Sequence, residues 1–219
     1  WRHRWVWAKF ASSAEFWGGY FVKKLMSGRI KSKEIRLELE NQIKVLLGFG
    51  ITPTHWDGHQ NKHLYPQFFF NAMSVAKKYN ITRIRSHRRY LFVQDISYRK
   101  RYLIKYYLKN PYRFITHMFG RTTTKIAELN GFRAAARLIT PAYADNSKKY
   151  LLDSWLALMK NLPEGINEIY CHPGYPDDIL KKYAKYVYER EKEVKILTSK
   201  EIKDAIKKYN IELISFKDI

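Results

Sequence analysis

The sequence predicts an α/β protein with a largely parallel sheet. Helical periodicities alternate with short strand-like runs, and histidine and aspartate residues stand where two of those runs end. Of the 219 residues, 46% are hydrophobic and 16% aromatic, which is enough to build a folded core despite 28% charged residues. This length, without a Gly/Ser-rich or Pro-rich linker, predicts one domain over residues 1–219.

The first elements follow a helix, strand, loop, helix, strand order. Ser32 is predicted to cap a helix that ends at Gly48. Apolar residues recur every four positions in that helix: Ile35, Leu39 and Ile43. "ITPTHWDGH", residues 51–59, predicts a short strand that runs into a loop, because Pro53 disfavours helical backbone. Alternate residues of a strand share a face, so His55, Asp57 and His59 are expected on one side.

Pro66 suits the first turn of the next helix, residues 66–80. Its expected buried stripe consists of Phe68, Ala72, Val75, Ala76 and Tyr79. "ITRIR", residues 81–85, predicts a compact strand. From 86 to 146 the pattern is basic and aromatic with only short helical stretches, which is typical of an insertion over the working face.

Regular patterns return near residue 148. A helix is predicted over 148–162 and a strand from 166, on which Ile166, Ile169 and Cys171 face apolar neighbours. His172 stands where this strand breaks at Pro173-Gly174. A helix over 178–194, a capping box at Thr198–Glu201, a helix over 202–210 and a closing strand over 211–216 complete the prediction.

Composition narrows the function classes. Lys and Arg number 41 against 20 Asp and Glu, a formal charge of +21 that would suit nucleic acid, anionic membranes or acidic glycans. The charge is spread along the chain and no RNA-binding signature occurs, so we expect no nucleic-acid partner. Cys171 is the single cysteine, which excludes an internal disulfide. No apolar run approaches ~18 residues and no signal peptide is visible, so we expect no transmembrane span and a cytoplasmic location.

The segment "THWDGHQNKH" contains the candidate reactive residues, a cluster of histidines with one aspartate. Reacting groups of parallel α/β proteins gather where strands end, and His59 and His172 both stand at such points. Imidazole nitrogen and carboxylate oxygen, with water, form a ligand set for a hydrolytic divalent metal. A surface loop without metal is the alternative, because short motifs produce many false matches. His63 would pair with His59 only on a helix.

Three ordered segments resemble one family. "THWDGHQNKHLYPQFF", "EIYCHPGYPDD" and "EREKEVKILTSKEIKDAIKKYNIELISF" are similar to segments of the YdjC-like (ChbG/HpnK-type) carbohydrate deacetylases. The resemblance implies a distorted β/α barrel of the polysaccharide-deacetylase type, here incomplete at the N-terminus. It also implies a metal-dependent hydrolase that removes acetyl groups from N-acetylated amino sugars or oligosaccharides in carbohydrate metabolism. The implied partner is an N-acetylated sugar or glycolipid substrate. Aromatic residues such as Trp1, Trp5 and Trp7 would separately suit the interface of a homodimer.

The resemblance also implies residue roles. His59 corresponds to a metal ligand, with Mg²⁺ expected and Zn²⁺ as the alternative. Asp57 orients the site, His172 is the acid that protonates the leaving amine or binds substrate, and His55 and His63 support the site or bind substrate. The family's "ADD" and "GLHLN" segments, which carry further ligands, do not occur in this sequence. A non-catalytic sugar-binding protein and a basic surface-binding protein therefore remain as alternatives.

Overall fold

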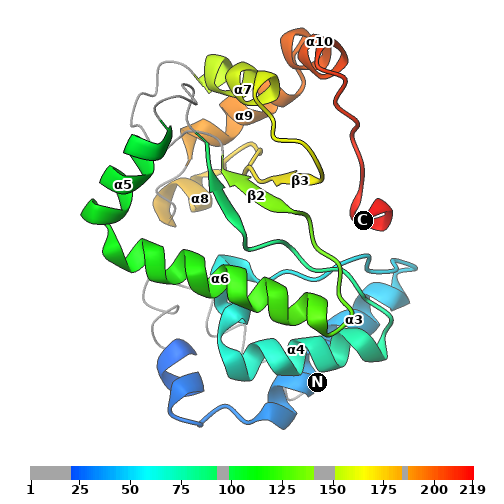
Figure 1. Ribbon diagram of the computed structural model, residues 1–219. Coiled ribbons are helices and arrows are strands. Elements are labelled where there is room, and N and C mark those ends of the chain that lie inside the picture. The colour runs from blue at the N-terminus through cyan, green and yellow to red at the C-terminus, as the bar shows by residue number, and fades with distance from the viewer. Residues whose placement is uncertain (1–20, 93–98, 141–150, 184–186) are drawn as a thin grey trace. The chain divides into compact units, whose positions relative to one another are not determined.

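The computed structural model describes residues 21–92, 99–140, 151–183 and 187–219 (Figure 1). The chain divides into two compact units, Trp1–Thr82 and Arg83–Ile219. In the first unit, residues 21–26 are helical and are followed by the helices α3 (Ser32–Gly48), η2 (His59–Leu64, a 3₁₀-helix) and α4 (Pro66–Lys78).

Helix α3 confirms the predicted helix, with its cap one residue earlier. Lys31 is the N-cap, and its backbone N–H donates to Glu34 Oε2 at 2.7 Å. Gly50, two residues after the helix, adopts φ 73°, a left-handed conformation that glycine takes without a Cβ penalty. The predicted apolar stripe is only partly buried, since Ile35 is buried whereas Leu39 and Ile43 are half-buried.

Helix α4 begins at Pro66 as predicted, because a proline at the first position has no N–H that the helix would need. Its buried face includes Ala72, Val75 and Ala76 as predicted, but Phe69 is buried in place of Phe68, and Tyr79 is only half-buried. The buried set is Phe69, Asn71, Ala72, Met73, Val75 and Ala76. Two amides attach α4 to the start of α3: Gln67 Nε2 donates to Ile30 O at 2.8 Å, and Asn71 Nδ2 donates to Ser32 Oγ at 3.1 Å.

The strand predicted over 51–59 is wrong. Residues 51–58 have no regular secondary structure apart from a single bridge residue at Trp56, and the 3₁₀-helix η2 begins at His59. Backbone sterics at Pro53 exclude helix here, but strand formation also needs a paired neighbour, which the sequence pattern does not specify.

The second unit is built on a parallel sheet. Strands β1 (Arg89–Leu91), β2 (Arg137–Thr140) and β3 (Asn167–Ile169) pair in that order, with Arg89 opposite Leu138 and Leu138 opposite Glu168. This confirms the α/β class with a parallel sheet. The three described strands form an open sheet, so the closed barrel remains a prediction. The strand predicted over 81–85 is reduced to a bridge between Arg83 and Arg133.

Six helices accompany these strands in the described residues. They are α5 (Arg99–Lys109), α6 (Pro111–Leu129), α7 (Leu151–Lys160), α8 (Asp178–Tyr183), α9 (Tyr188–Leu197) and α10 (Lys200–Lys208). In place of the short helical stretches predicted from 86 to 146, the described residues 86–92 and 99–140 form two well-formed helices and two strands. The helix predicted over 178–194 is divided into α8 and α9. The predicted closing strand is wrong: residues 211–215 lack strand structure and lead into η3 (Phe216–Asp218).

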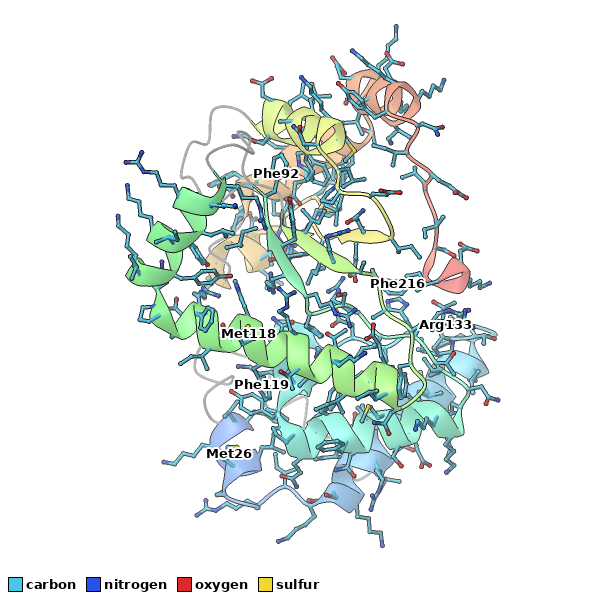
Figure 2. The ribbon with its side chains drawn as sticks, in the orientation of Figure 1. Met26, Phe92, Met118, Phe119, Arg133 and Phe216 are labelled. Atoms are coloured by element: carbon cyan, nitrogen blue, oxygen red, sulfur yellow. The ribbon has the colours of Figure 1, made fainter. Side chains whose placement is uncertain are left out.

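The core of this unit lies between the sheet and α7, α9 and α10. Ile139 of β2 packs in one buried cluster with Trp155 and Leu158 of α7, Ile196 of α9 and Ile202 of α10. Phe92, which directly follows β1, belongs to the same cluster and lies close to α7 in Figure 2. Figure 1 shows α6 running on the other side of the sheet from α7 and α10.

The chain end is attached to the second unit by arginines. Arg83 Nε and Arg133 Nη1 donate to Ile219 O at 3.1 and 3.0 Å. Ser199, not Thr198, caps α10, since its Oγ accepts the Ile202 N–H at 3.3 Å. Among the described residues, no helix is long and apolar enough to cross a membrane.

Candidate functional site

The first unit places Asp57 next to a buried histidine. His63 is 1% exposed, and its Nε2 lies 3.9 Å from Asp57 Oδ1. The His63 ring packs edge-on against Trp56, with centroids 5.6 Å apart, and Trp56 in turn contacts Phe69 of α4. Aromatic packing therefore fixes the imidazole while the carboxylate stays at the solvent side, 26% exposed.

Gly58 makes the burial of His63 possible. A Cβ at Gly58 would lie 2.2 Å from His63 Nδ1 and 2.6 Å from its Cγ, distances at which atoms cannot coexist. The backbone of Gly58 is ordinary extended chain, φ −129° and ψ 134°, so glycine is required here by the space that His63 occupies and not by conformation. The glycine of "DGH" is thus required because the ring of His63 occupies the space that a side chain at position 58 would need.

The other two histidines of the motif are His55 and His59. His55 is half-buried, and its Nδ1 shares a hydrogen bond with Thr54 Oγ1 at 3.1 Å. His59 is the first residue of η2, and the structure describes its backbone only. A helix does begin before Pro66, but it is a 3₁₀-helix with three residues per turn, so position 59 stacks with 62 and not with 63. The ligand role of His59 stays a prediction.

His172 of the second unit follows β3 and is held by a buried glutamate. Its backbone N–H donates to Glu193 Oε2 at 2.5 Å, and Glu193, from α9, is 0% exposed. The His172 ring packs edge-on against Tyr170, with centroids 5.6 Å apart. Burial and the Glu193 carboxylate raise the pKa of the neighbouring Cys171 thiol, which keeps it protonated at neutral pH.

Strand alternation on β3 separates an apolar face from a polar one. Ile169 and Cys171 pack on the core cluster, as predicted, whereas Ile166 is 40% exposed, contrary to prediction. Glu168 and Tyr170 face the other side. Glu168 accepts hydrogen bonds from Arg85 Nε at 2.5 Å and from the Ser86 backbone N–H at 3.3 Å.

Arg89 of β1 lies in the same sheet row as Glu168 and contacts Tyr170. Its Nη1 donates to Tyr170 Oη at 3.1 Å, and its guanidinium lies 5.3 Å from the tyrosine ring centroid. The sequence did not single out Arg89, Glu168, Tyr170 or Glu193 as site residues. Glu193 lies in the charged run "EREKEV", and the sequence alone does not distinguish this buried glutamate from the more exposed ones around it.

The described donors of the first unit suit a divalent cation. Imidazole nitrogen and carboxylate oxygen bound to one zinc ion at about 2.0–2.2 Å lie roughly 3–4 Å apart. The 3.9 Å between Asp57 Oδ1 and His63 Nε2 falls in this range. Carboxylate oxygen also suits Mg²⁺ completed by water, whereas imidazole favours Zn²⁺. The exposed side of Asp57 leaves room for further ligands.

The chain matches a protein family and several named relatives. The family model described as YdjC-like protein matches residues 12–208. The chain is 34% identical over 187 residues to a carbohydrate deacetylase of Clostridium beijerinckii, covering 85% of this chain and 62% of the relative. It is 30% identical over 183 residues to a carbohydrate deacetylase of Thermoanaerobacter pseudethanolicus, covering 84% of this chain and 59% of the relative.

One solved structure shares the fold. A crystal structure from Enterococcus faecalis, named for cellobiose-phosphate cleavage, superposes with a TM-score of 0.61 at 23% identity, covering 88% of this chain and 62% of that one. The chain thus spans about three fifths of the length of the relatives it matches. Because the family model covers almost the whole sequence, including the histidine motif and His172, the chain belongs to the YdjC-like family.

Proposed function

We propose that this chain is the greater part of a metal-dependent deacetylase that removes acetyl groups from N-acetylated amino sugars, free or carried on a lipid. The observation that carries the proposal is the pairing of Asp57 with the buried His63, 3.9 Å apart, inside the histidine motif of a YdjC-like chain. Two relatives of this chain are named carbohydrate deacetylases, which supports the same reaction here.

The cation would be held by Asp57, His59 and His63. When bound, it would supply Lewis-acid polarisation of the acetamide carbonyl and a lowered pKa for water. His63 cannot rotate away, because Trp56 and Gly58 enclose its ring. His55, bonded to Thr54, would support the motif from the other side.

His172 would act as the acid. Hydrolysis breaks the amide C–N bond, adds a hydroxyl to the acetyl carbon and leaves an amine that must take up a proton. A protonated imidazole of His172 would donate that proton to the leaving nitrogen. Glu193 fixes the backbone of His172, and Tyr170, held by Arg89, orients the ring, so both act as positioning residues.

Metal binding and acetate release test the proposal together. The purified chain is mixed with short N-acetylglucosamine oligomers and either Mg²⁺ or Zn²⁺, acetate is measured, and metal affinity is measured separately by calorimetry. Asp57→Asn and His59→Ala should weaken metal binding at least tenfold and abolish acetate release. Asp204→Asn, an exposed carboxylate on α10, is the control and should change neither.

Two outcomes would contradict the proposal. If metal affinity is the same in Asp57→Asn, in His59→Ala and in the unchanged chain, the motif is not the metal site. If the chain binds the oligomers but releases no acetate with either metal, a non-catalytic sugar-binding function replaces the enzyme. His172→Gln should slow acetate release while leaving metal affinity unchanged, which separates the acid from the ligands.

A further inference from the structure

A pocket lined by arginines lies at the edge of the sheet where β1 and β2 begin. Its volume is about 230 Å³, which is roughly eight times the volume that a water molecule occupies in the liquid. Its lining residues come from β1, β2 and α6 and the residues just before the strands: Arg88, Arg89, Tyr90, Arg121, Ala136 and Arg137. Four of these six side chains carry a guanidinium.

The strand register brings two of these arginines face to face. Because β1 and β2 are parallel and Arg89 pairs with Leu138, Arg88 stands opposite Arg137 on the neighbouring strand. Like charges on directly opposite sheet positions destabilise the pair. A fold that keeps two arginines there needs negative charge nearby to offset the repulsion.

Within the part of the chain that the structure describes, one carboxylate supplies that charge for Arg88 and uncharged groups contact Arg137. Arg88 forms a two-pronged ion pair with Glu128 of α6, whose pKa this contact lowers. Arg137 Nη1 instead donates to uncharged acceptors, the Glu164 backbone oxygen at 2.7 Å and Asn167 Oδ1 at 3.3 Å. Arg121 is exposed on α6. Among the described residues, the Glu128 carboxylate thus pairs with Arg88, whereas the acceptors of Arg137 carry no charge.

We propose that this pocket binds a tetrahedral oxyanion of the phosphate class, either free phosphate or a phosphomonoester group on a larger molecule. Guanidinium groups present paired N–H donors that match two oxygens of such an anion, which a lysine ammonium cannot do. The anion would bridge Arg121 and Arg137 and neutralise the charge that Glu128 leaves uncompensated.

This pocket and the proposed deacetylase acid lie at different edges of the sheet, and Arg89 is common to both, since it lines the pocket and holds Tyr170 beside His172. Arg88 and Arg137 stand at the edge where the parallel strands begin, whereas His172 follows β3 at the edge where they end. The edge where strands begin is not where α/β proteins gather their reacting groups. The site therefore goes beyond the proposed function, and the anion would stabilise the unit or regulate it without reacting.

Calorimetry with the metal-free chain tests this inference, without any acetylated sugar, so its result is independent of the deacetylase proposal. Inorganic phosphate, sulfate and glucose 6-phosphate are titrated separately at an ionic strength held constant with chloride. Phosphate and sulfate should both bind and raise the melting temperature, whereas chloride alone should not. Tighter binding of glucose 6-phosphate than of phosphate would identify a phosphomonoester as the ligand, and equal or weaker binding would identify the free anion.

Arginine variants decide whether binding occurs in this pocket. Arg121→Gln and Arg137→Gln should each raise the Kd for phosphate about tenfold, because each removes one charged donor pair. Arg101→Gln on α5 is the matched control: it is also an exposed helical arginine, but it lies outside the pocket. Circular dichroism verifies that each variant folds. If Arg137→Gln does not fold, the phosphate affinity of Arg121→Gln alone decides the test. Unchanged affinity in folded Arg121→Gln, or no binding of either oxyanion above chloride, would overturn the inference.

Discussion

Replacing Gly58 by alanine tests the geometry of the histidine motif most directly. The added Cβ would lie 2.2 Å from His63 Nδ1, so either the ring or the 3₁₀-helix that carries it must move. His63 is 1% exposed and packed against Trp56, which leaves the ring no free direction. Forced overpacking of this kind costs about 1–3 kcal/mol.

The backbone offsets part of that cost. Gly58 has φ −129°, which alanine adopts without strain, and a glycine-to-alanine change at such a position stabilises by about 0.4–1 kcal/mol through the unfolded chain. The net loss in the free energy of unfolding should be about 1–2 kcal/mol. For a protein of this size, each kcal/mol lowers the melting temperature by about 2–4 °C.

Gly48→Ala is the matched control. Gly48 ends α3, and a Cβ there would meet no atom within 4 Å, so this variant should be as stable as the unchanged protein or more stable. Urea unfolding gives the free energies. The same substitution is also made in a His63→Gly background, which removes the clash. His63→Ala would not remove it, since the His63 Cβ itself lies 2.7 Å from the Cβ added at position 58.

The cost of Gly58→Ala should vanish in the His63→Gly background, because the two residues would no longer compete for the same space. An equal cost in both backgrounds would refute the contact as the reason for glycine at position 58. So would a Gly58→Ala protein that unfolds at the same urea concentration as the unchanged protein.

Two further predictions concern the second unit. Glu193→Gln should lower the apparent pKa of the Cys171 thiol, because the substitution removes a negative charge that helps to raise this pKa. The pH dependence of Cys171 alkylation measures the pKa, and an unchanged value would contradict the influence of Glu193. Burial, with nearby arginines, lowers the pKa of His117 to about 4, below its value of 6.5 in an unfolded chain. The unfolded chain therefore takes up the proton first, and His117 costs stability as pH falls from about 6.5 toward 4. Lowering the pH from 7 to 5 should therefore destabilise the unchanged protein by about 1 kcal/mol more than it destabilises His117→Gln, a value that includes solvent screening of the arginine charges. Urea unfolding of both proteins at both pH values measures this difference. Equal losses of stability in the two proteins would contradict the prediction.

Local patterns predicted α3 and α4 well but failed over α5 and α6. On α6 the buried face consists of small and polar residues, namely His117, Gly120, Thr123, Thr124 and Ala127. Its exposed face carries large apolar side chains, namely Phe114, Ile115, Met118 and Phe119. A periodicity that assumes apolar residues inside gives the wrong face here, because close backbone approach favours small residues: Gly120 would place a Cβ 2.9 Å from the His87 carbonyl oxygen.

The candidate site was predictable to the extent that it is local. Asp57, Gly58 and His63 lie within seven residues, and the contacts among them require only a tight turn and one aromatic neighbour. The contact that supports His172 is not local, because Glu193 is 21 residues away, on helix α9. Its burial depends on how α9 packs, which a single sequence does not reveal.

The polar face of the sheet explains why that packing matters. Parallel sheets are ordinarily apolar on both faces, so Glu168 and Arg89 on one face of β1 to β3 need partners within the protein. Arg85 and the Ser86 N–H satisfy Glu168, and Tyr170 accepts from Arg89. Since a partly buried charge that loses its partner costs more than the pair contributes, these contacts hold their residues in place. Tyr170 is thereby fixed against the ring of His172, and the side chain proposed as the acid is positioned by the same contacts that make a polar sheet face stable.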